Sequence, residues 1–343
     1  MPGGNEHVKN DTKAHGASSI GALFMPPYTA ATTLLGAAIG LEALEFYITS
    51  SLFPSMVRDI GGLEHLAWAT SLFIAAIVLG SIAVVVRPRA MNLNATYITG
   101  AVIFALGCLA IGFAPNMTMV LLGRVVQGFG AGLLVTMSYS FIRFVYPDGM
   151  QNAASAFYTA LWGVSTLLGP AIGGLFSAGS GWRWAFLLLI PPALIMAVAA
   201  PKLLPSGAEE RQKQPFPGLQ IMLVLAGIVA VSFAGTVSGD GLRKLLLAGG
   251  AVTLVAIVLV ERRLTARLLP KRATYLTHPL ALAYLAMFTM IVVLNSDIYV
   301  PYFLQTLHAT SPLVAGFIVA LVASGWTAAG LLTASWRGRR MRI

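Results

Sequence analysis

Four ionisable side chains of this 343-residue chain lie inside long apolar runs, where an uncompensated charge is expensive. Glu42 and Glu45 are three residues apart, so a helix would place both on one face. Arg124 and Asp297 lie in two later runs. A charged side chain inside a membrane costs several kcal/mol, and removal from water favours the neutral form of a carboxyl group. The acids are therefore candidates for reversible proton uptake, with Arg124 as a partner.

If each apolar run crosses a membrane and the N-terminus is inside, the three side chains Glu45, Arg124 and Asp297 lie at a similar predicted depth in the membrane. Glu45 lies nine residues before Pro54, near the outer end of the first run. Arg124 lies about seven residues into the fourth run, and Asp297 about seven residues from the outer end of the ninth. At about 1.5 Å of rise per residue, Glu45 and Arg124 both lie roughly 10–13 Å below the outer surface. A couple between these two side chains is geometrically allowed.

Structural interpretations of the same residues stay open. Glu42 can snorkel toward water or pair locally. Arg124 can act as a clamp between helices, and Asp297 can face an outer vestibule without a role. The sequence alone does not choose between these interpretations and a proton-coupling site.

Polar and aromatic side chains near the acids predict a cavity that could receive a small molecule. Gln127 follows Arg124 by three residues, and Phe46, Tyr47, Trp162 and Tyr299 are the aromatic candidates. Aromatic faces offer apolar and cation–π contacts to a substrate. Each ring could equally make an ordinary lipid or core contact.

A cluster of glycines around one proline marks the fifth apolar run. Proline removes a backbone hydrogen bond and bends a helix, while glycine lets a neighbouring helix approach closely. The pattern predicts a kinked helix at a seam between moving bundles, with simple tight packing as the alternative. The residues are Gly163, Gly169, Pro170, Gly173 and Gly174.

The composition requires a membrane. Apolar residues make up 57% of the chain and charged residues 10%, a fraction that no soluble domain can bury. We expect an all-α, polytopic membrane helix bundle of about ten transmembrane helices. The single cysteine, Cys108, excludes an intrachain disulfide. The segments predicted to span are 28–53, 66–86, 95–114, 117–141, 152–178, 184–201, 217–237, 243–261, 278–304 and 312–335.

The net charge of +10 is explained by the loops rather than by nucleic-acid binding. With the N-terminus inside, 17 Lys and Arg residues fall on the cytoplasmic side and 4 on the other. This asymmetry places both termini in the cytoplasm of a multi-pass cell-membrane protein (the plasma or inner membrane). The polar N-terminus lacks an apolar core and is interpreted as a tail, not a signal peptide.

Two polar linkers divide the chain. The predicted organisation is a cytoplasmic tail, a six-helix bundle, a linker, an extra two-helix insertion, a second linker and the incomplete start of a second bundle. The corresponding ranges are 1–27, 28–201, 202–216, 217–261, 262–277 and 278–343.

Several motifs resemble the major facilitator superfamily, in its drug:proton antiporter branch with fourteen spans. LLGRVVQGFGAG resembles the fourth-span motif of that family, which implicates Arg124 in proton transfer. WGVSTLLGPAIGG resembles the fifth-span antiporter motif, with Ser165 where a further glycine is usual. EFYITSSLFP puts Glu45 at the family's acidic position and Pro54 at its proline.

The resemblance extends over nearly all of residues 28–340, with two departures. GWRWAFLLLIPPAL resembles the start of the sixth span, and the pair of helices after it resembles the insertion of fourteen-span members. The loop GSIAVVVRPRAMNLN has no aspartate where the family usually has an acid. The chain also stops after the tenth segment, so the resemblance implies a truncated or partial sequence.

The resemblance implies a secondary active transporter that exports small amphipathic compounds by proton antiport with alternating access. The alternatives are a carrier of a defined metabolite, such as a siderophore or sugar, and a non-transporting fragment. No metal-ligand pair, nucleophile–base spacing or Walker loop is present, so an enzyme and ATP drive are not expected. We expect no metal and no cofactor. The expected energy source is the proton gradient. The expected partners are a small-molecule substrate, protons and the lipid bilayer. No nucleic-acid partner is expected, and the protein is expected to be a monomer.

Overall fold

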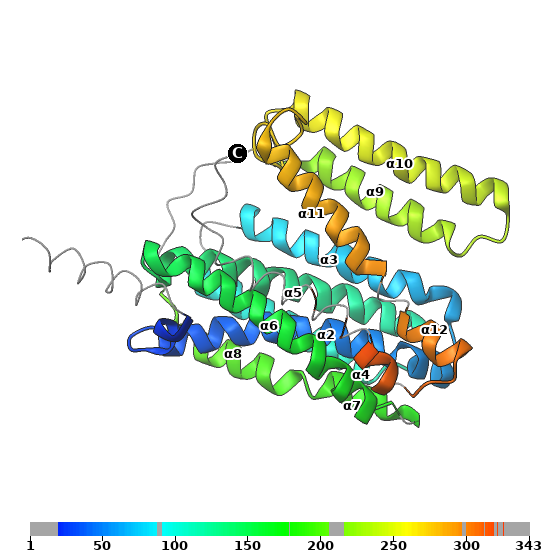
Figure 1. Ribbon diagram of the computed structural model, residues 1–343, viewed down its shortest axis with the longest axis horizontal. Helices are drawn as coiled ribbons and strands as arrows, with labels where there is room; N and C mark the ends of the chain where they lie inside the picture. Colours follow the sequence, from blue (N-terminus) through cyan, green and yellow to red (C-terminus); the bar gives the residue numbers. More distant parts are fainter. Residues whose placement is uncertain are drawn as a thin grey trace, which may run out of the picture.

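The computed structural model describes residues 20–87, 91–177, 179–205, 216–296, 300–311, 313–318, 321 and 325. In these residues the secondary structure is helical, without a β-strand (Figure 1). The α-helices are α2 (Thr29–Ile60), α3 (Leu66–Val86), α4 (Leu93–Gly112), α5 (Met117–Val145), α6 (Asp148–Leu175), α7 (Trp182–Leu187), α8 (Ile190–Leu203), α9 (Gly218–Ala234), α10 (Asp240–Arg263), α11 (Pro279–Ser296) and α12 (Val300–Leu307). Short 3₁₀ turns at Ile20–Phe24, Leu63–His65 and Gly179–Gly181 precede α2, α3 and α7.

Six helical stretches of the described chain are long and apolar enough to cross a membrane, so the protein is a multi-pass membrane protein. They are Thr29–Ile60, Leu63–Val85, Leu93–Gly112, Met117–Val145, Gly179–Leu203 and Asp240–Arg263. The fifth predicted span, α6, is not among them, since its first turns are polar and its second half is rich in glycine. Helix α9 is apolar but shorter.

One predicted span differs from a single helix. The segment 184–201 is divided into α7 and α8, because Pro191 and Pro192 fit the first turn of a helix but cannot continue one. In the segment 278–304 the described residues form α11 up to Ser296 and α12 from Val300, and residues 297–299 lie outside the described residues. Most of the tenth segment, 312–335, lies outside the described residues.

Asparagine side chains fix the starts of two central helices. The side chain of Asn92 accepts a hydrogen bond from the backbone N–H of Ala95 at 2.7 Å, before α4. Asn116 does the same for Met119 at 3.0 Å, before α5. Such caps satisfy N–H groups that have no partner within the helix. Both helices therefore begin at positions set by the sequence.

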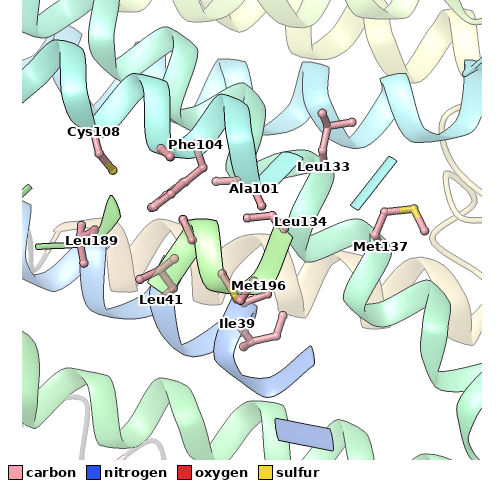
Figure 2. Close-up of a cluster of buried hydrophobic side chains, with 14 of the residues drawn as sticks. Ile39, Leu41, Ala101, Phe104, Cys108, Leu133, Leu134, Met137, Leu189 and Met196 are labelled. Atoms are coloured by element: carbon pink, nitrogen blue, oxygen red, sulfur yellow. The ribbon is translucent and has the colours of Figure 1, made fainter. Parts of the chain in front are cut away.

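The core lies between α2, α4, α5 and α8 (Figure 2). Helix α4 packs along α5 and α8, while α2 packs along α6. Figure 2 shows a cluster of buried hydrophobic side chains from this region. Its labelled members are Ile39, Leu41, Ala101, Phe104, Cys108, Leu133, Leu134, Met137, Leu189 and Met196.

Glycines bring α5 into backbone contact with α4. A Cβ atom on Gly107 of α4 would lie 2.3 Å from the backbone nitrogen of Gln127. A Cβ atom on Gly130 of α5 would lie 2.3 Å from the backbone nitrogen of Phe104. Neither position has room for a side chain, so this crossing depends on glycine.

Other glycines of α5 face α3. A Cβ atom on Gly128 would lie 2.5 Å from the carbonyl oxygen of Phe73, and one on Gly132 would lie 2.2 Å from that of Ile77. The glycines of the motif GRVVQGFGAG thus serve two helix faces, one toward α4 and one toward α3. Small residues let membrane helices pack closely in this way.

Helices α9 and α10 form an antiparallel pair beside α3 (Figure 1). Helix α9 contacts α3, where the rings of Trp68 and Phe233 meet edge to face with centroids 6.3 Å apart. The pair occupies the predicted insertion, 217–261. Many of its apolar side chains are exposed, as is expected of helices that face lipid.

Candidate functional site

The structure brings Glu45 of α2 and Arg124 of α5 into direct contact. Arg124 Nη1 donates a hydrogen bond to Glu45 Oε1. The side chain of Glu45 is 0% exposed and that of Arg124 is 2% exposed. A buried charge without a partner is very costly, and two opposite charges in contact compensate each other in part. The pair is therefore a buried salt bridge that links α2 to α5.

Three further groups hold the guanidinium of Arg124. Nη1 also donates to Oε1 of Gln127 at 2.8 Å, and Nε donates to the backbone carbonyl of Ala69 at 3.3 Å. The guanidinium carbon lies 3.7 Å from the centroid of the Phe73 ring, a cation–π contact. Helices α2, α3 and α5 thus fix Arg124 from three sides.

The carboxyl groups retain oxygens without hydrogen-bond donors. Thr49 donates its hydroxyl to Oε1 of Glu45 at 2.6 Å, but Oε2 of Glu45 meets no donor within the described part of the chain. Glu42, one turn earlier and 7% exposed, likewise has an Oε2 without a donor among those residues. Each free oxygen is a position at which a carboxyl group can carry a proton.

Gln127 connects the pair to α4. While its Oε1 accepts from Arg124, its Nε2 lies 3.1 Å from the sulfur of Cys108. Gln127 and Cys108 are both buried. Gln127, predicted from sequence as a cavity residue, is therefore a contact within the bundle that orients Arg124.

Three of the predicted aromatic residues form a cluster. The ring of Phe46 lies 5.4 Å from that of Tyr47 and 6.1 Å from that of Trp162, and Tyr47 and Trp162 are 6.3 Å apart. All three are half-buried, on α2 and α6. Asp297 and Tyr299 lie outside the described residues, so their predicted roles stay predictions.

The glycines of α6 face α2. A Cβ atom on Gly169 would lie 2.3 Å from the Cβ of Tyr47, and one on Gly173 would lie 2.8 Å from the Cβ of Ser51. This close approach allows α6 to run along α2, the helix that carries both glutamates. The fifth-span motif is thereby connected directly to the acidic helix.

The same part of α6 also contacts the end of the described chain. A Cβ atom on Gly174 would lie 3.2 Å from the Cβ of Leu313, and one on Gly316 would lie 2.1 Å from the Cβ of Pro170. Gly163 is half-buried and lies two turns before Pro170 on α6. The Gly-Pro cluster is therefore at a boundary between the first six spans and the segment that follows α12.

Four residues of the site were not predicted from the sequence. Thr49 follows Glu45 by four residues, and this helical spacing was a usable signal. Ala69, Phe73 and Cys108 carried none, because the runs in which they lie are uniformly apolar and show no preferred face. Their contacts with Arg124 and Gln127 follow from tertiary packing.

A second ion pair ties the end of α2 to the start of α7. Asp59, near the end of α2, accepts from Nη1 of Arg183 and, at 3.0 Å, from Nε1 of Trp182. Nη2 of Arg183 donates to the carbonyl of Ala114 at 3.0 Å, and its guanidinium stacks 4.3 Å from the ring of Trp182. The conspicuous WRW sequence thus joins α2, the turn before α5 and α7.

We expect Arg183→Gln to lower the free energy of unfolding by about 1 kcal/mol, because it removes a partly exposed ion pair and a hydrogen bond to a backbone carbonyl. Thermal unfolding in detergent micelles measures the change. Arg243→Gln is the control. Arg243 also pairs with an acid, Asp240, at 3.5 Å and donates to the Val237 carbonyl at 3.0 Å. These contacts are exposed and stay within one helix end, so the midpoint should shift much less. Equal shifts in both variants would contradict the assignment of a structural tie to Arg183.

Membrane-spanning helices around a buried acid–arginine pair define a polytopic membrane helix bundle. The family described as the Major Facilitator Superfamily matches residues 35–343, and the chain belongs to this family. It is a membrane transporter and not an enzyme. The family resemblance and the all-α major facilitator fold predicted from sequence are confirmed.

Similar proteins include drug exporters. The chain is 32% identical over 321 residues to a probable multidrug-efflux transporter of Mycobacterium tuberculosis, covering 92% of this chain and 68% of that protein. It is 25% identical to the multidrug efflux pump SdrM of Staphylococcus aureus, covering 83% and 64%. It is 28% identical to the tetracenomycin C resistance and export protein of Streptomyces glaucescens, covering 83% and 54%.

Solved transporters share the fold. A peptide transporter crystallised with sulfate matches with a TM-score of 0.62 at 13% identity, covering 96% of this chain and 73% of that one. A D-xylose–proton symporter matches with a TM-score of 0.50 at 13% identity, covering 87% and 80%. At this identity the likeness concerns the fold alone.

Proposed function

We propose that this protein exports small amphipathic compounds in exchange for protons, by alternating access. The observation that carries the proposal is the buried Glu45–Arg124 pair, whose carboxyl group retains a free oxygen. Ionisable groups inside a membrane bundle mark ion and proton pathways. The relatives named as efflux proteins support outward transport as the direction and small molecules as the substrate.

Protonation of Glu45 would change the site without collapsing it. A neutral carboxyl group attracts Arg124 less strongly than a carboxylate, while Gln127, the Ala69 carbonyl and the Phe73 ring still hold the guanidinium. The cation therefore keeps a defined position in both protonation states. Glu42, on the same helix face, offers a second carboxyl group for the proton.

Helix α6 would transmit the change. Its glycines contact α2 beside the glutamates, and its Pro170 contacts Gly316 beyond the sixth span. Proline and glycine permit a local bend where a continuous hydrogen-bonded helix would resist it. We propose that this region is the seam across which the two bundles rock, with the aromatic cluster of Phe46, Tyr47 and Trp162 facing substrate.

The distribution of basic residues supports an orientation with both termini in the cytoplasm. The proposed location is the cell membrane, and the proposed state is a monomer. No metal or organic cofactor is invoked, because the proton gradient supplies the driving force.

The test is proton release from liposomes. The purified protein is reconstituted with a pH-sensitive dye inside and an imposed pH gradient, and lipophilic cations, sugars and siderophores are added in turn. We expect the amphipathic cations to discharge the gradient and to accumulate against their own gradient. Discharge by sugars or siderophores alone, or by none of these compounds, would overturn the proposal.

A further inference from the structure

The linker between α10 and α11 is folded into a defined loop. Glu261, 2% exposed, accepts the backbone N–H of Leu268 at 2.8 Å through Oε1 and that of Leu269 at 3.2 Å through Oε2. Gln220 of α9 donates its Nε2 to the carbonyl oxygen of Ala266. Charged and amide groups thus anchor the first half of the loop to both helices of the insertion.

The second half of the loop is anchored by Arg262. Its Nη2 donates to the carbonyl of Thr274, and its guanidinium lies 5.0 Å from the centroid of the Tyr275 ring. Between these ties, Arg272 has φ +75°, in the left-handed region that a non-glycine residue adopts only when its surroundings impose it. The positions of the basic residues are therefore set by the fold of the loop.

Three of these basic residues line an open pocket of about 450 Å³ in the loop between α10 and α11. No acidic side chain is among its lining residues, and Arg267 is half-buried while Lys271 and Arg272 are exposed. The lining residues are Arg267, Lys271, Arg272, Tyr275, Thr277 and His278. A topology signal requires basic residues on one side of the membrane but does not require them to converge on a cavity.

We propose that this cavity binds the phosphate group of an anionic phospholipid. Arginine matches phosphate geometry with two parallel donors, and lysine adds a compact charge. Basic pockets at the cytoplasmic ends of membrane helices bind lipid headgroups. The loop connects α10 and α11, and two exposed apolar side chains, Leu264 and Leu276, lie in the same loop. A lipid satisfies both the charge and the apolar surface, which free phosphate would not.

The experiment uses native mass spectrometry of the full chain in detergent, titrated with phosphatidylglycerol and with phosphatidylcholine. The variant Arg267→Gln/Lys271→Gln/Arg272→Gln removes the cations, and Lys271→Gln alone changes one exposed residue. The control Arg143→Gln/Lys202→Gln/Arg263→Gln removes three exposed charges from the same predicted face. Since each basic residue near an anionic surface strengthens binding by about fivefold, the first phosphatidylglycerol should bind the triple variant at least about tenfold more weakly.

We expect the control to retain its affinity, the single variant to lose part of it and phosphatidylcholine to bind weakly throughout. Equal losses in variant and control, or no loss in either, would overturn the proposal. Thermal unfolding verifies that the triple variant is folded. If the triple variant is unfolded, the phosphatidylglycerol affinity of the single variant decides the outcome. Inorganic phosphate separates the two sources of the ligand: displacement of the lipid at millimolar concentration would overturn the lipid assignment, and no displacement supports it.

Discussion

Glu45→Gln is expected to abolish proton-coupled export, reducing proton release in liposomes to the level of protein-free vesicles. Glutamine preserves the shape of the side chain and an oxygen that can accept from Arg124 and Thr49, so the packing of α2 against α5 should survive. It cannot exchange a proton, and coupling requires a group that does. Proton release and its pH dependence, measured with the dye assay above, report the effect directly.

Glu64→Gln is the matched control for this loss. Glu64 is 64% exposed, at the predicted outer end beside His65, and its substitution removes the same charge without touching the buried pair. It should leave proton release unchanged. Unchanged exchange and unchanged pH dependence in the Glu45 variant would exclude Glu45 as the coupling group, whatever the control shows.

Gly107→Ala is expected to lower the free energy of unfolding by about 1–3 kcal/mol. The added methyl group would lie 2.3 Å from the nitrogen, 2.4 Å from the Cα and 2.5 Å from the Cβ of Gln127. Because two of these atoms are backbone, no side-chain rotation relieves the clash, and α4 must move away from α5. Thermal or denaturant unfolding in micelles measures the loss.

Gly249→Ala provides the opposite expectation. Gly249 is also inside a helix, α10, but a Cβ atom there would meet no atom within 4 Å. Alanine should leave stability unchanged or raise it by up to about 1 kcal/mol, since it favours the helix without a clash. If both variants were equally stable, the close crossing of α4 and α5 would be contradicted.

Helix geometry explains why the Glu45–Arg124 contact could be anticipated. The rise per residue is fixed, so counting from the ends of two spans places both side chains at one depth. Counting residues does not predict which side chain of a third helix contacts Arg124. Helix α3 is apolar on every face, so nothing in its sequence distinguishes Phe73 from its neighbours.

Span boundaries were predictable where a cap or a charge ends the helix, and less so elsewhere. Asn92 and Asn116 stand at the starts of α4 and α5, close to the predicted boundaries. The division of 184–201 depends on Pro191 and Pro192, which a count of apolar residues does not weigh. The polar ties of Glu261 to the next loop were also missed, because its role depends on where the chain folds back.

The two glycine faces of α5 restrict how its sequence can drift over evolutionary time. Every replacement of a glycine adds atoms, and Gly128 and Gly132 toward α3, like Gly130 toward α4, have no space to receive them. Neutral variation on this helix must therefore concentrate on the outward side, where Leu122 is 59% exposed. Homologues should differ there freely while the inner faces stay nearly invariant, even among carriers with unrelated cargo.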